Sequence, residues 1–486
     1  MRRFSNRPAI RSDLLEAGGA LRLNPGSMFS RCCGLLIAFC VGLLSATAST
    51  NHHVILITID GLAAYYFTDP RAPIPTLRKL ATNGAVAEGM HVSNPAVTWP
   101  NHTTLITGVP PRKHSVLFNG VLVRPGADKP VKIDPERDQS DLISVPTLYD
   151  YLHRAGYRTA AINWPCTRRA LALDDNFSDV PDQITYMTPR LRDELLATGI
   201  LSSTNDAAFR EQSAAVKDQI WTTAAAHVIE ERRPNLLLLH MLITDSTQHK
   251  YGPQSPAAYT AVALADAQVA TILRAVEQAG IREQTTVFVT ADHGFATATK
   301  IVSPNIVLRK AGLLETDASR GIVSARAQVI AEGGIAMVYF TDPTTLSADR
   351  AKLSSLLRDH EGVADIVTPD RFAVLGLPDP DRNRQMADLI LVARDGYAFN
   401  NESRGDVSVT DATIPAGNVG HHGCLSDNSR MNAAFVAWGR GIRPGVNLGI
   451  IDNIDIAPTI ARMLGESIVG ADGHVLNRML TDDVMR

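Results

Sequence analysis

The sequence VILITIDG at residues 54–61 decides the fold class, because it is a short apolar run that ends abruptly in an acidic residue and a glycine. A run of this kind is typical of a strand that is buried on both faces in a helix-covered parallel sheet. Two similar runs, at 236–243 and 286–290, each follow a segment with helical periodicity, at about 210–232 and 258–280. This alternation predicts a parallel, doubly wound α/β sheet.

The same rhythm holds over most of the chain. Further helices are expected at about 75–83, 144–155 and 454–464, and further strands at 159–163 and 433–438. Residues 320–410 interrupt it, with strand-like runs at 335–340 and 387–392 around a helix at 347–359. We therefore expect a catalytic α/β core from 49–319 and 411–486, with 320–410 as an inserted α+β subdomain.

The first 48 residues predict a leader. Arg31 precedes an apolar run at 35–44, which is too short for a stable transmembrane helix, and Ala46-Thr47-Ala48 then provides an A-x-A cleavage site. Met28 is the expected true start of this signal peptide. The mature protein is therefore expected to be periplasmic or secreted, with no stable membrane span.

Charge and composition exclude several classes of protein. The 486 residues are 45% hydrophobic and 20% charged, as in an ordinary globular chain. Removing residues 1–48 takes six basic and two acidic side chains from totals of 47 and 50, leaving a formal charge of −7. A mildly acidic chain without basic runs is a poor binder of nucleic-acid duplexes. Two cysteines remain, Cys166 and Cys424, and either a disulfide or two free thiols is compatible with the sequence.

Acidic residues and histidines follow three of the expected strands, and a histidine pair lies in a loop before a fourth. Alone, each is most often a helix cap or a turn residue. The carboxyl ends of parallel strands meet at one edge, however, so we expect all four sites to converge there. Carboxylate oxygen with imidazole nitrogen suits zinc, with manganese or iron possible, and the number of side chains suffices for two ions. The residues are Asp60; Asp245 and His249; Asp292 and His293; and His421 and His422.

Thr98 is the candidate nucleophile. It precedes Trp99-Pro100, and residues 101–107 form an expected short helix that ends at Gly108. A helix N-terminus attracts a phosphate through its N–H groups and its dipole. Without a metal nearby the same threonine would be read as a helix cap, but beside two metal ions it could act as an activated alkoxide.

These segments resemble the nucleotide pyrophosphatase/phosphodiesterase family of the alkaline phosphatase superfamily, and the resemblance extends over about residues 53–465. Its fold, an α/β sheet sandwiched by helices, agrees with the alternation described above. The segments that carry the resemblance are Asp60-Gly61, Thr98-Trp99-Pro100-Asn101-His102, Thr107-Gly108 with His114, Asp245-Ser246 with His249, Tyr251-Gly252-Pro253, Ala291-Asp292-His293-Gly294, and His422-Gly423 with Asp427-Asn428.

The resemblance implies two divalent metal ions, preferably Zn²⁺. One would be bound by Asp245, His249 and His422, where we choose His422 over His421 because the family's ligand directly precedes a glycine. The other would be bound by three further residues, with the Thr98 oxygen touching it: Asp60, Asp292 and His293.

The resemblance also implies a reaction, namely hydrolysis of a small-molecule phosphodiester or nucleotide by double displacement through a covalent Thr98 intermediate. Asn119 would hydrogen-bond a phosphoryl oxygen, although an Asn-Gly pair is also a common turn. Trp99 would stack on the leaving nucleoside, with core packing as its alternative. Tyr186 is a candidate second stacking ring.

One departure from the family keeps a rival function open. Relatives often read Trp-Pro-Gly where this chain has Trp164-Pro165-Cys166, and Arg168 and Arg169 follow here. An arginine in the site would pair the extra oxygens of a phosphate monoester. A phosphomonoesterase or phosphonate hydrolase on the same scaffold is therefore the alternative, unless both arginines are solvated.

Overall fold

A computed structural model describes residues 51–179, 181–317, 321–414 and 419–485. The expected leader, with Met28 and the cleavage site, lies outside the described residues. The compact unit described below spans residues from Thr50 to the C-terminal end of the chain.

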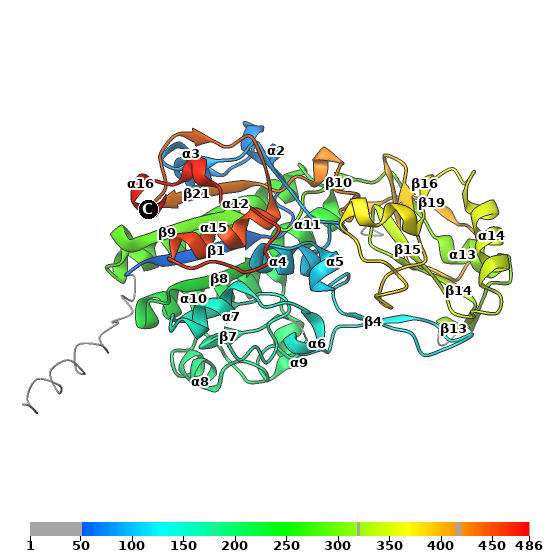
Figure 1. The fold of residues 1–486 in the computed structure, drawn as a ribbon, viewed down its shortest axis with the longest axis horizontal. Coiled ribbons are helices and arrows are strands. Elements are labelled where there is room, and N and C mark those ends of the chain that lie inside the picture. The colour runs from blue at the N-terminus through cyan, green and yellow to red at the C-terminus, as the bar shows by residue number, and fades with distance from the viewer. Residues whose placement is uncertain (1–50, 180, 318–320, 415–418, 486) are drawn as a thin grey trace, which may run out of the picture. The chain divides into compact units, whose positions relative to one another are not determined.

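The centre of this unit is an eight-stranded sheet in the order β22-β2-β21-β9-β1-β8-β6-β7 (Figure 1). Its middle is formed by β1 (His53–Ile59), β8 (Leu236–Met241) and β9 (Thr285–Thr290), in which every residue is buried. The two strands β6 (Thr159–Ile162) and β7 (Asp175–Phe177) continue it on one side. All five strands run parallel, as the apolar runs predict.

The other side of the sheet differs from the purely parallel sheet that we expected. β21 (Phe435–Gly439) is antiparallel to β9, and β2 (Ala85–Val86) is antiparallel to β21. The last strand, β22 (Val446–Asn447), runs parallel to β2. The sheet is thus mixed. Its direction could not be read from the sequence, because a buried antiparallel strand has the same continuous apolar run as a parallel one.

Helices cover the sheet in two groups that pack within themselves, one on each face, as the alkaline-phosphatase-like fold requires. One group contains α3 (Pro75–Thr82), α10 (Ala214–Arg232), α11 (Ile243–Tyr251) and α12 (Pro256–Gln278). The other contains α4 (Thr98–Thr107), α7 (Leu148–Arg154) and α15 (Ile456–Met463). Among the described helices, α12 alone is long and apolar enough to cross a membrane by length and composition, but it packs against α10 and α11.

A second, antiparallel sheet, in the order β14-β15-β17-β16, lies within the segment 320–410 where we expected an inserted subdomain. Its strands are β14 (Ala327–Ala331), β15 (Ile335–Phe340), β16 (Val363–Val367) and β17 (Leu389–Ala393), and α14 (Leu346–Leu357) lies against it. Its apolar core also includes Val302, Leu308 and Leu313, which precede residue 320. The packing unit around this sheet therefore starts earlier in the chain than the break in rhythm suggested.

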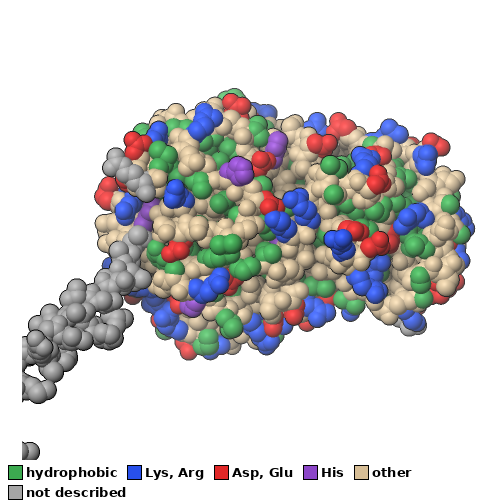
Figure 2. Space-filling model, viewed as in Figure 1, with side chains coloured by type: hydrophobic (Ala, Val, Ile, Leu, Met, Phe, Trp, Pro, Cys, Tyr) green, Lys and Arg blue, Asp and Glu red, His purple; other side chains and the backbone are tan. Residues whose placement is uncertain are grey.

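Charged side chains of both signs are interspersed on the face of the molecule in Figure 2. Lys and Arg do not gather into a basic stripe on that face. This distribution agrees with the excess of acidic residues in the sequence, and it offers no broad cationic surface to a phosphate backbone.

Candidate metal centre and nucleophile

The ends of β1 and β9 bring three side chains into a fully buried cluster. Asp60 follows β1, and Asp292 and His293 follow β9, the neighbouring parallel strand. The Nε2 atom of His293 lies 3.4 Å from Oδ1 of Asp60 and 3.3 Å from Oδ2 of Asp292. The backbone N–H of Gly61 donates to the other Asp292 oxygen, Oδ1, at 3.2 Å. Two carboxylate oxygens and one imidazole nitrogen thus face a common point.

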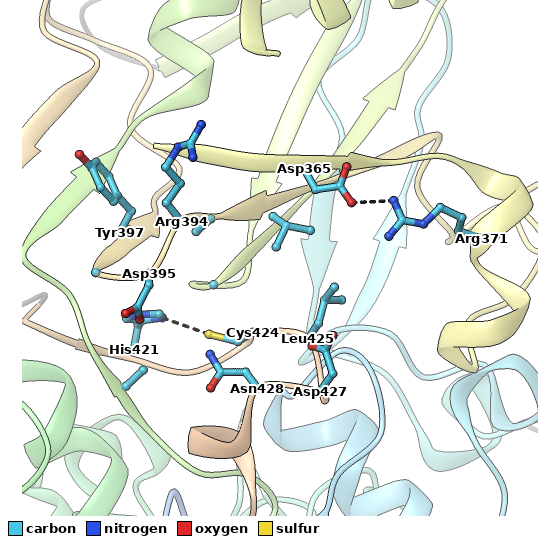
Figure 3. A pocket seen from close by; sticks show the side chains of 15 residues that line it. Asp365, Arg371, Arg394, Asp395, Tyr397, His421, Cys424, Leu425, Asp427 and Asn428 are labelled. Atoms are coloured by element: carbon cyan, nitrogen blue, oxygen red, sulfur yellow. Dashed lines mark hydrogen bonds and ion pairs between the residues drawn. The ribbon is translucent and has the colours of Figure 1, made fainter. Parts of the chain in front are cut away.

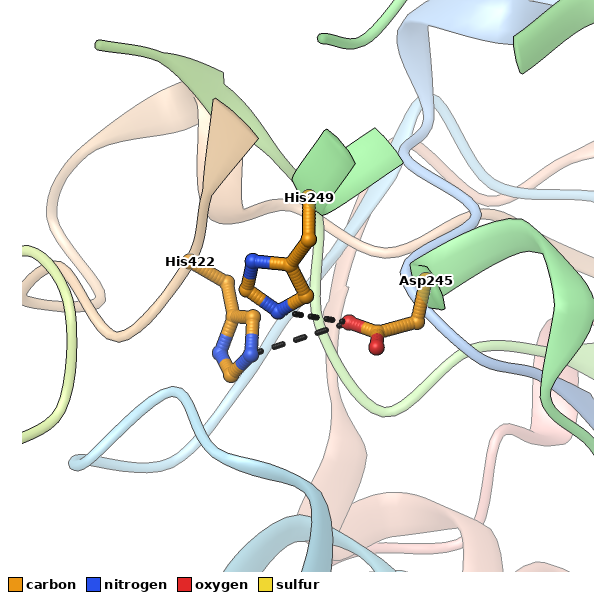
Figure 4. Close-up of side chains that lie close together, drawn as sticks. All are labelled: Asp245, His249 and His422. Carbon is orange, nitrogen blue, oxygen red and sulfur yellow. Dashed lines mark ion pairs between the residues drawn. The ribbon is translucent and has the colours of Figure 1, made fainter. Parts of the chain in front are cut away.

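A second cluster combines one helix with one loop (Figure 4). Asp245 and His249 are one turn apart on α11, and Nε2 of His249 lies 3.2 Å from Oδ1 of Asp245. His422 approaches the same oxygen from a loop, with its Nε2 at 3.7 Å. The rings of His293 and His422 stack with centroids 3.8 Å apart, so the two clusters are adjacent.

The three cluster histidines share one hydrogen-bonding pattern, in which the Nδ1 of each ring donates to a backbone carbonyl. The acceptors are Gly420 for His249, Gly294 for His293 and Ala96 for His422, at 3.1, 3.1 and 2.9 Å. A neutral ring with its proton on Nδ1 turns the Nε2 lone pair toward the cluster, which is the arrangement that metal-binding histidines use.

The donor atoms of both clusters fit metal ions. Four atoms that face the clusters are buried and have no hydrogen-bond partner: Asp60 Oδ1, Asp245 Oδ1, Asp292 Oδ2 and His293 Nε2. A buried polar atom without a partner is costly, whereas oxygen and nitrogen atoms grouped in this way satisfy a divalent cation. The described residues therefore contain two candidate metal-binding groups.

Electrostatics point the same way. Burial, together with the nearby carboxylates of Asp292 and Asp245, raises the pKa of Asp60 well above its ordinary value. Burial would also raise the pKa of Asp245, but His249 and His422 outweigh it and hold that pKa below the ordinary value. Three buried carboxylates in one place repel one another, and bound cations would relieve that repulsion.

Thr98 is tied to both clusters by the backbone around it. It is the first residue of α4, after Val97 at the N-cap position, so the helix begins three residues earlier than we expected. Two residues before it, the Ala96 carbonyl accepts from the cluster residue His422. The carbonyl of Thr98 accepts a hydrogen bond from Nδ1 of His102 at 2.9 Å. The same Nδ1 atom lies 3.7 Å from Oδ2 of Asp292. Thr98 therefore lies at a helix N-terminus whose backbone contacts residues of both candidate metal sites.

Asn119 lies beside this helix start. Its Oδ1 accepts from the backbone N–H of Trp99 at 2.9 Å, which fixes the amide and leaves its Nδ2 donors directed elsewhere. The side chain is exposed, and it belongs to the short turn in which Phe118 bridges Gly120. The amide oxygen of Asn119 is thus used by the start of α4, and its role toward a phosphoryl oxygen stays a prediction.

The profile of the type I phosphodiesterase/nucleotide pyrophosphatase family matches residues 54–424, which contain all of these side chains. The chain belongs to this family. Its expected fold, with an α/β sheet covered by helices, is confirmed by solved structures of family members.

Curated relatives of the chain are distant. The bis(5′-adenosyl)-triphosphatase enpp4 of Xenopus laevis is 22% identical over 90% of this chain and 84% of its own length. Venom phosphodiesterase 2 of Crotalus adamanteus is 23% identical over 50% of this chain but only 26% of its own. Against relatives such as the venom enzymes, the chain thus spans about a quarter of their length.

Solved structures of ectonucleotide pyrophosphatase/phosphodiesterase 5 share the fold. The murine protein superposes with a TM-score of 0.62 at 16% identity, covering 88% of this chain and 100% of its own. The human protein gives 0.63 at the same identity and coverage. At this identity the likeness establishes the fold alone.

Trp99 occupies a different environment from the one that the family resemblance suggested. It is only 3% exposed and packs with Val116, Ile143 and Cys166, and its indole N–H donates to Asp179 at 2.9 Å. The ring has no open face for a stacked nucleoside, so the structure favours the packing alternative for Trp99.

Arg168 and Arg169 are not directed at either of the two candidate metal clusters. Both pair with the carboxylate of Asp138, at 2.8 and 3.0 Å. Their guanidinium groups also lie over the ring of Tyr186, 4.0 and 4.9 Å from its centroid. The two guanidinium groups thus occupy the ring of Tyr186, where we expected a nucleoside to stack. Both arginines are paired with Asp138, so in this arrangement neither is directed at a phosphate monoester.

His421 faces away from the second cluster, into a cavity of about 300 Å³ beside the second sheet (Figure 3). Its Nδ1 lies 3.3 Å from the His422 carbonyl and 3.9 Å from the sulfur of Cys424. The next residue after His422, Gly423, has a φ of +72°, and a Cβ there would lie 1.6 Å from the Glu332 carbonyl. This close approach requires the glycine that follows His422. Cys424 and Cys166 are both free thiols, so no disulfide joins them.

For three residues around the site, no role was predicted from the sequence. His240 on β8 contacts Asp60, His102 connects Thr98 to that histidine, and Asp218 on α10 caps the start of α11. His240 lies inside an apolar strand and Asp218 inside a helix, so each resembles an incidental polar residue. Only the register, which places Thr58 opposite His240, reveals the contact with Asp60.

Proposed function

We propose that the chain is a two-metal phosphodiesterase and nucleotide pyrophosphatase that acts through a covalent intermediate on Thr98. One observation carries this proposal. Two groups of carboxylate and imidazole donors meet at the carboxyl edge of the sheet, and the N-terminus of α4 is tied to both of them.

Two divalent ions, preferably zinc, are proposed at these groups. Asp60, Asp292 and His293 would hold one, with the Thr98 hydroxyl beside it, and Asp245, His249 and His422 would hold the other. Two ions held by these groups would supply positive charge to the entering and leaving oxygens of an in-line displacement.

The protein groups account for the rest of the reaction. Thr98 Oγ1 forms a bond to phosphorus as the bond from phosphorus to the leaving oxygen breaks, and the hydroxyl proton passes to the leaving oxygen or to water. Asn119 Nδ2 donates to a non-bridging oxygen and stabilises the charge that develops there. Water then attacks phosphorus from the side opposite Thr98, the bond from phosphorus to Thr98 breaks, and a proton of that water passes to the threonine oxygen.

Small nucleotides or phosphodiesters are the proposed substrates. The frog relative is named as a bis(5′-adenosyl)-triphosphatase, and a variant of murine ectonucleotide pyrophosphatase/phosphodiesterase 5 described as inactive is in complex with AMP. The absence of a basic stripe from the face in Figure 2 supports a small substrate over a duplex. We also propose export to the periplasm or the medium, on the grounds of the apolar run at 35–44 and Ala46-Thr47-Ala48.

Two measurements on purified enzyme test the proposal. Elemental analysis should find two equivalents of metal, and prolonged dialysis against a chelator should abolish activity that added zinc restores. Metal-replete enzyme should hydrolyse a nitrophenyl-thymidylate diester faster than nitrophenyl phosphate by orders of magnitude. A faster monoester would contradict the proposal and favour the phosphomonoesterase alternative.

A further inference from the structure

A buried triangle of polar side-chain atoms lies directly behind the cluster of Asp60, Asp292 and His293. Its corners are Thr58 Oγ1, His102 Nε2 and His240 Nδ1, with sides of 2.8, 3.0 and 3.1 Å. All three side chains are at most 2% exposed. We call this group the Thr58 triangle.

The outer atoms of the triangle fix its protons. His102 Nδ1 faces the Thr98 carbonyl, which can only accept, so that nitrogen carries a proton. His240 Nε2 faces Asp60 Oδ2 at 3.3 Å, and a carboxylate also accepts. In neutral rings, the two nitrogens inside the triangle then carry no proton, so the 3.1 Å contact between them is not a hydrogen bond. The Thr58 hydroxyl is the one donor among the three corners, and its oxygen lies within hydrogen-bond distance of both rings. The carbonyl of Leu239, 3.4 Å from the same oxygen, is a further acceptor.

This arrangement makes the two oxygens of Asp60 unequal. Oδ2 lies 3.3 Å from Nε2 of His240, whereas Oδ1 faces His293 at 3.4 Å and is buried without a hydrogen-bond partner. A carboxylate that binds an ion through one oxygen needs a second contact of this kind to fix its rotation.

We propose that His240 is a positioning residue for the metal site, whose Nε2–H holds Asp60 Oδ2 and so turns Oδ1 toward Asp292 and His293. The inference rests on the proposed function, since it requires a metal at that cluster. Through Thr58 and His102, the same network also reaches the carbonyl of Thr98, so it joins one metal ligand to the start of the nucleophile helix.

Two amide substitutions separate this role from simple packing. In His240→Gln the amide nitrogen can take the place of Nε2 and still donate to Asp60. In His240→Asn the shorter amide can replace only Nδ1, so it keeps a partner for Thr58 and loses Asp60. The matched control is His52→Gln, because His52 is equally buried, makes two hydrogen bonds and lies beside the opposite end of β1.

The readout is zinc affinity, measured by titration of metal-free protein whose fold is checked by circular dichroism. Wild type, His240→Gln and His52→Gln should bind two equivalents alike. His240→Asn should bind one equivalent about 10- to 100-fold more weakly, and excess zinc should restore its turnover. Equal binding by His240→Asn and wild type would overturn the inference, and so would equal weakening in His240→Gln or His52→Gln.

Two further results keep the inference separate from the proposed function. If His240→Asn does not fold, Thr58→Val serves instead: it removes the proton inside the triangle and should weaken the same equivalent by less than His240→Asn would. Unchanged affinity in Thr58→Val would then overturn the inference. If the wild-type chain binds fewer than two zinc ions, it is the proposed function that fails.

Discussion

The two candidate metal clusters are built in opposite ways. Asp60, Asp292 and His293 extend from the ends of adjacent strands, and all three side chains are at most 1% exposed. In the other cluster, Asp245 and His249 lie on α11 and His422 lies on a loop, with 15%, 37% and 13% of their side chains exposed. The first cluster is thus part of the sheet core, and the second is partly exposed to solvent. We call them the core cluster and the surface cluster.

This difference suggests a division of roles. A cluster fixed by strand ends and by buried neighbours such as His240 can hold its ion and the nucleophile in a constant geometry. A cluster on a helix and a loop is accessible to solvent, so leaving group and water can reach it. Substitutions in one cluster should therefore affect metal binding and turnover differently from substitutions in the other.

The largest effect is expected for Thr98→Ala, which removes the proposed nucleophile beside the cluster of Asp60, Asp292 and His293. Diester turnover should fall by at least about 1,000-fold, because the nucleophile is lost, while both metal equivalents remain bound. Thr98→Ser keeps a hydroxyl and serves as the control with partial activity. Turnover by Thr98→Ala close to that of wild type would mean that water is the first nucleophile.

His422→Ala should affect the surface cluster alone. The expected result is the loss of one metal equivalent and most of the turnover, because the ion keeps only Asp245 and His249. His421→Ala is the matched control, since His421 faces the neighbouring cavity, and it should keep both equivalents. Elemental analysis that finds two equivalents in His422→Ala would refute the choice of His422.

The two clusters should lose their metal ions at different rates. With a chelator in excess, one equivalent should leave faster than the other, because the surface cluster is open to solvent and the core cluster is sealed. In His422→Ala the fast phase should be missing. Release of both equivalents in a single phase would remove the distinction between the two clusters.

Asp218 links pH to the helix that carries the surface cluster. Its carboxylate accepts from the N–H groups of Leu242 and Ile243 at 2.8 and 2.9 Å, and burial raises its pKa to about 7, with Lys217 beside it. A carboxyl whose pKa is raised on folding keeps its proton in the folded chain between pH 4 and 7 and loses it in the unfolded chain. Its contribution to stability therefore falls as the pH rises through that window.

Asp218→Asn should abolish this dependence in metal-free protein. The difference in free energy of unfolding between wild type and variant should change by on the order of 4 kcal/mol between pH 4 and pH 8, with wild type relatively less stable at pH 8. Thermal melts across this range measure it. A difference that does not vary with pH would show that Asp218 ionises normally.

The smallest effect is expected for Arg168→Ala, because this arginine pairs with Asp138 and belongs to neither cluster. The kcat/KM for the diester should change by less than about fivefold, the range of a single surface ion pair. Arg169→Ala, with a more exposed side chain, is the companion variant. A selective loss of monoester hydrolysis in either variant would place that arginine in contact with the phosphate.

The convergence of the two residue clusters could be predicted from the sequence, whereas the contacts around them could not, and the reason is physical. Asp60 and Asp292 follow strands that are apolar on both faces, so the residue at which each strand ends is visible in the pattern. His240 and Thr58 contact each other only through the register of β1 and β8, which depends on tertiary packing. The pairing of Arg168 with Asp138 joins residues thirty positions apart on irregular segments, where no periodicity applies.

The fold shows the same limit. Strands β1, β8 and β9 were located to within two residues, whereas the antiparallel direction of β21 was not seen. The burial of Trp99 under Ile143 and Cys166 depends on loops whose course is set by their contacts and not by local preference.

The central claim is a double displacement through Thr98, and the stereochemistry at phosphorus tests it most directly. The measurement uses the nitrophenyl ester of thymidine 5′-phosphorothioate of one configuration, hydrolysed in ¹⁸O-labelled water. Two successive in-line displacements, first by Thr98 and then by water, predict net retention of configuration. Net inversion would show a single attack by water and would contradict the covalent intermediate, whatever the two clusters bind.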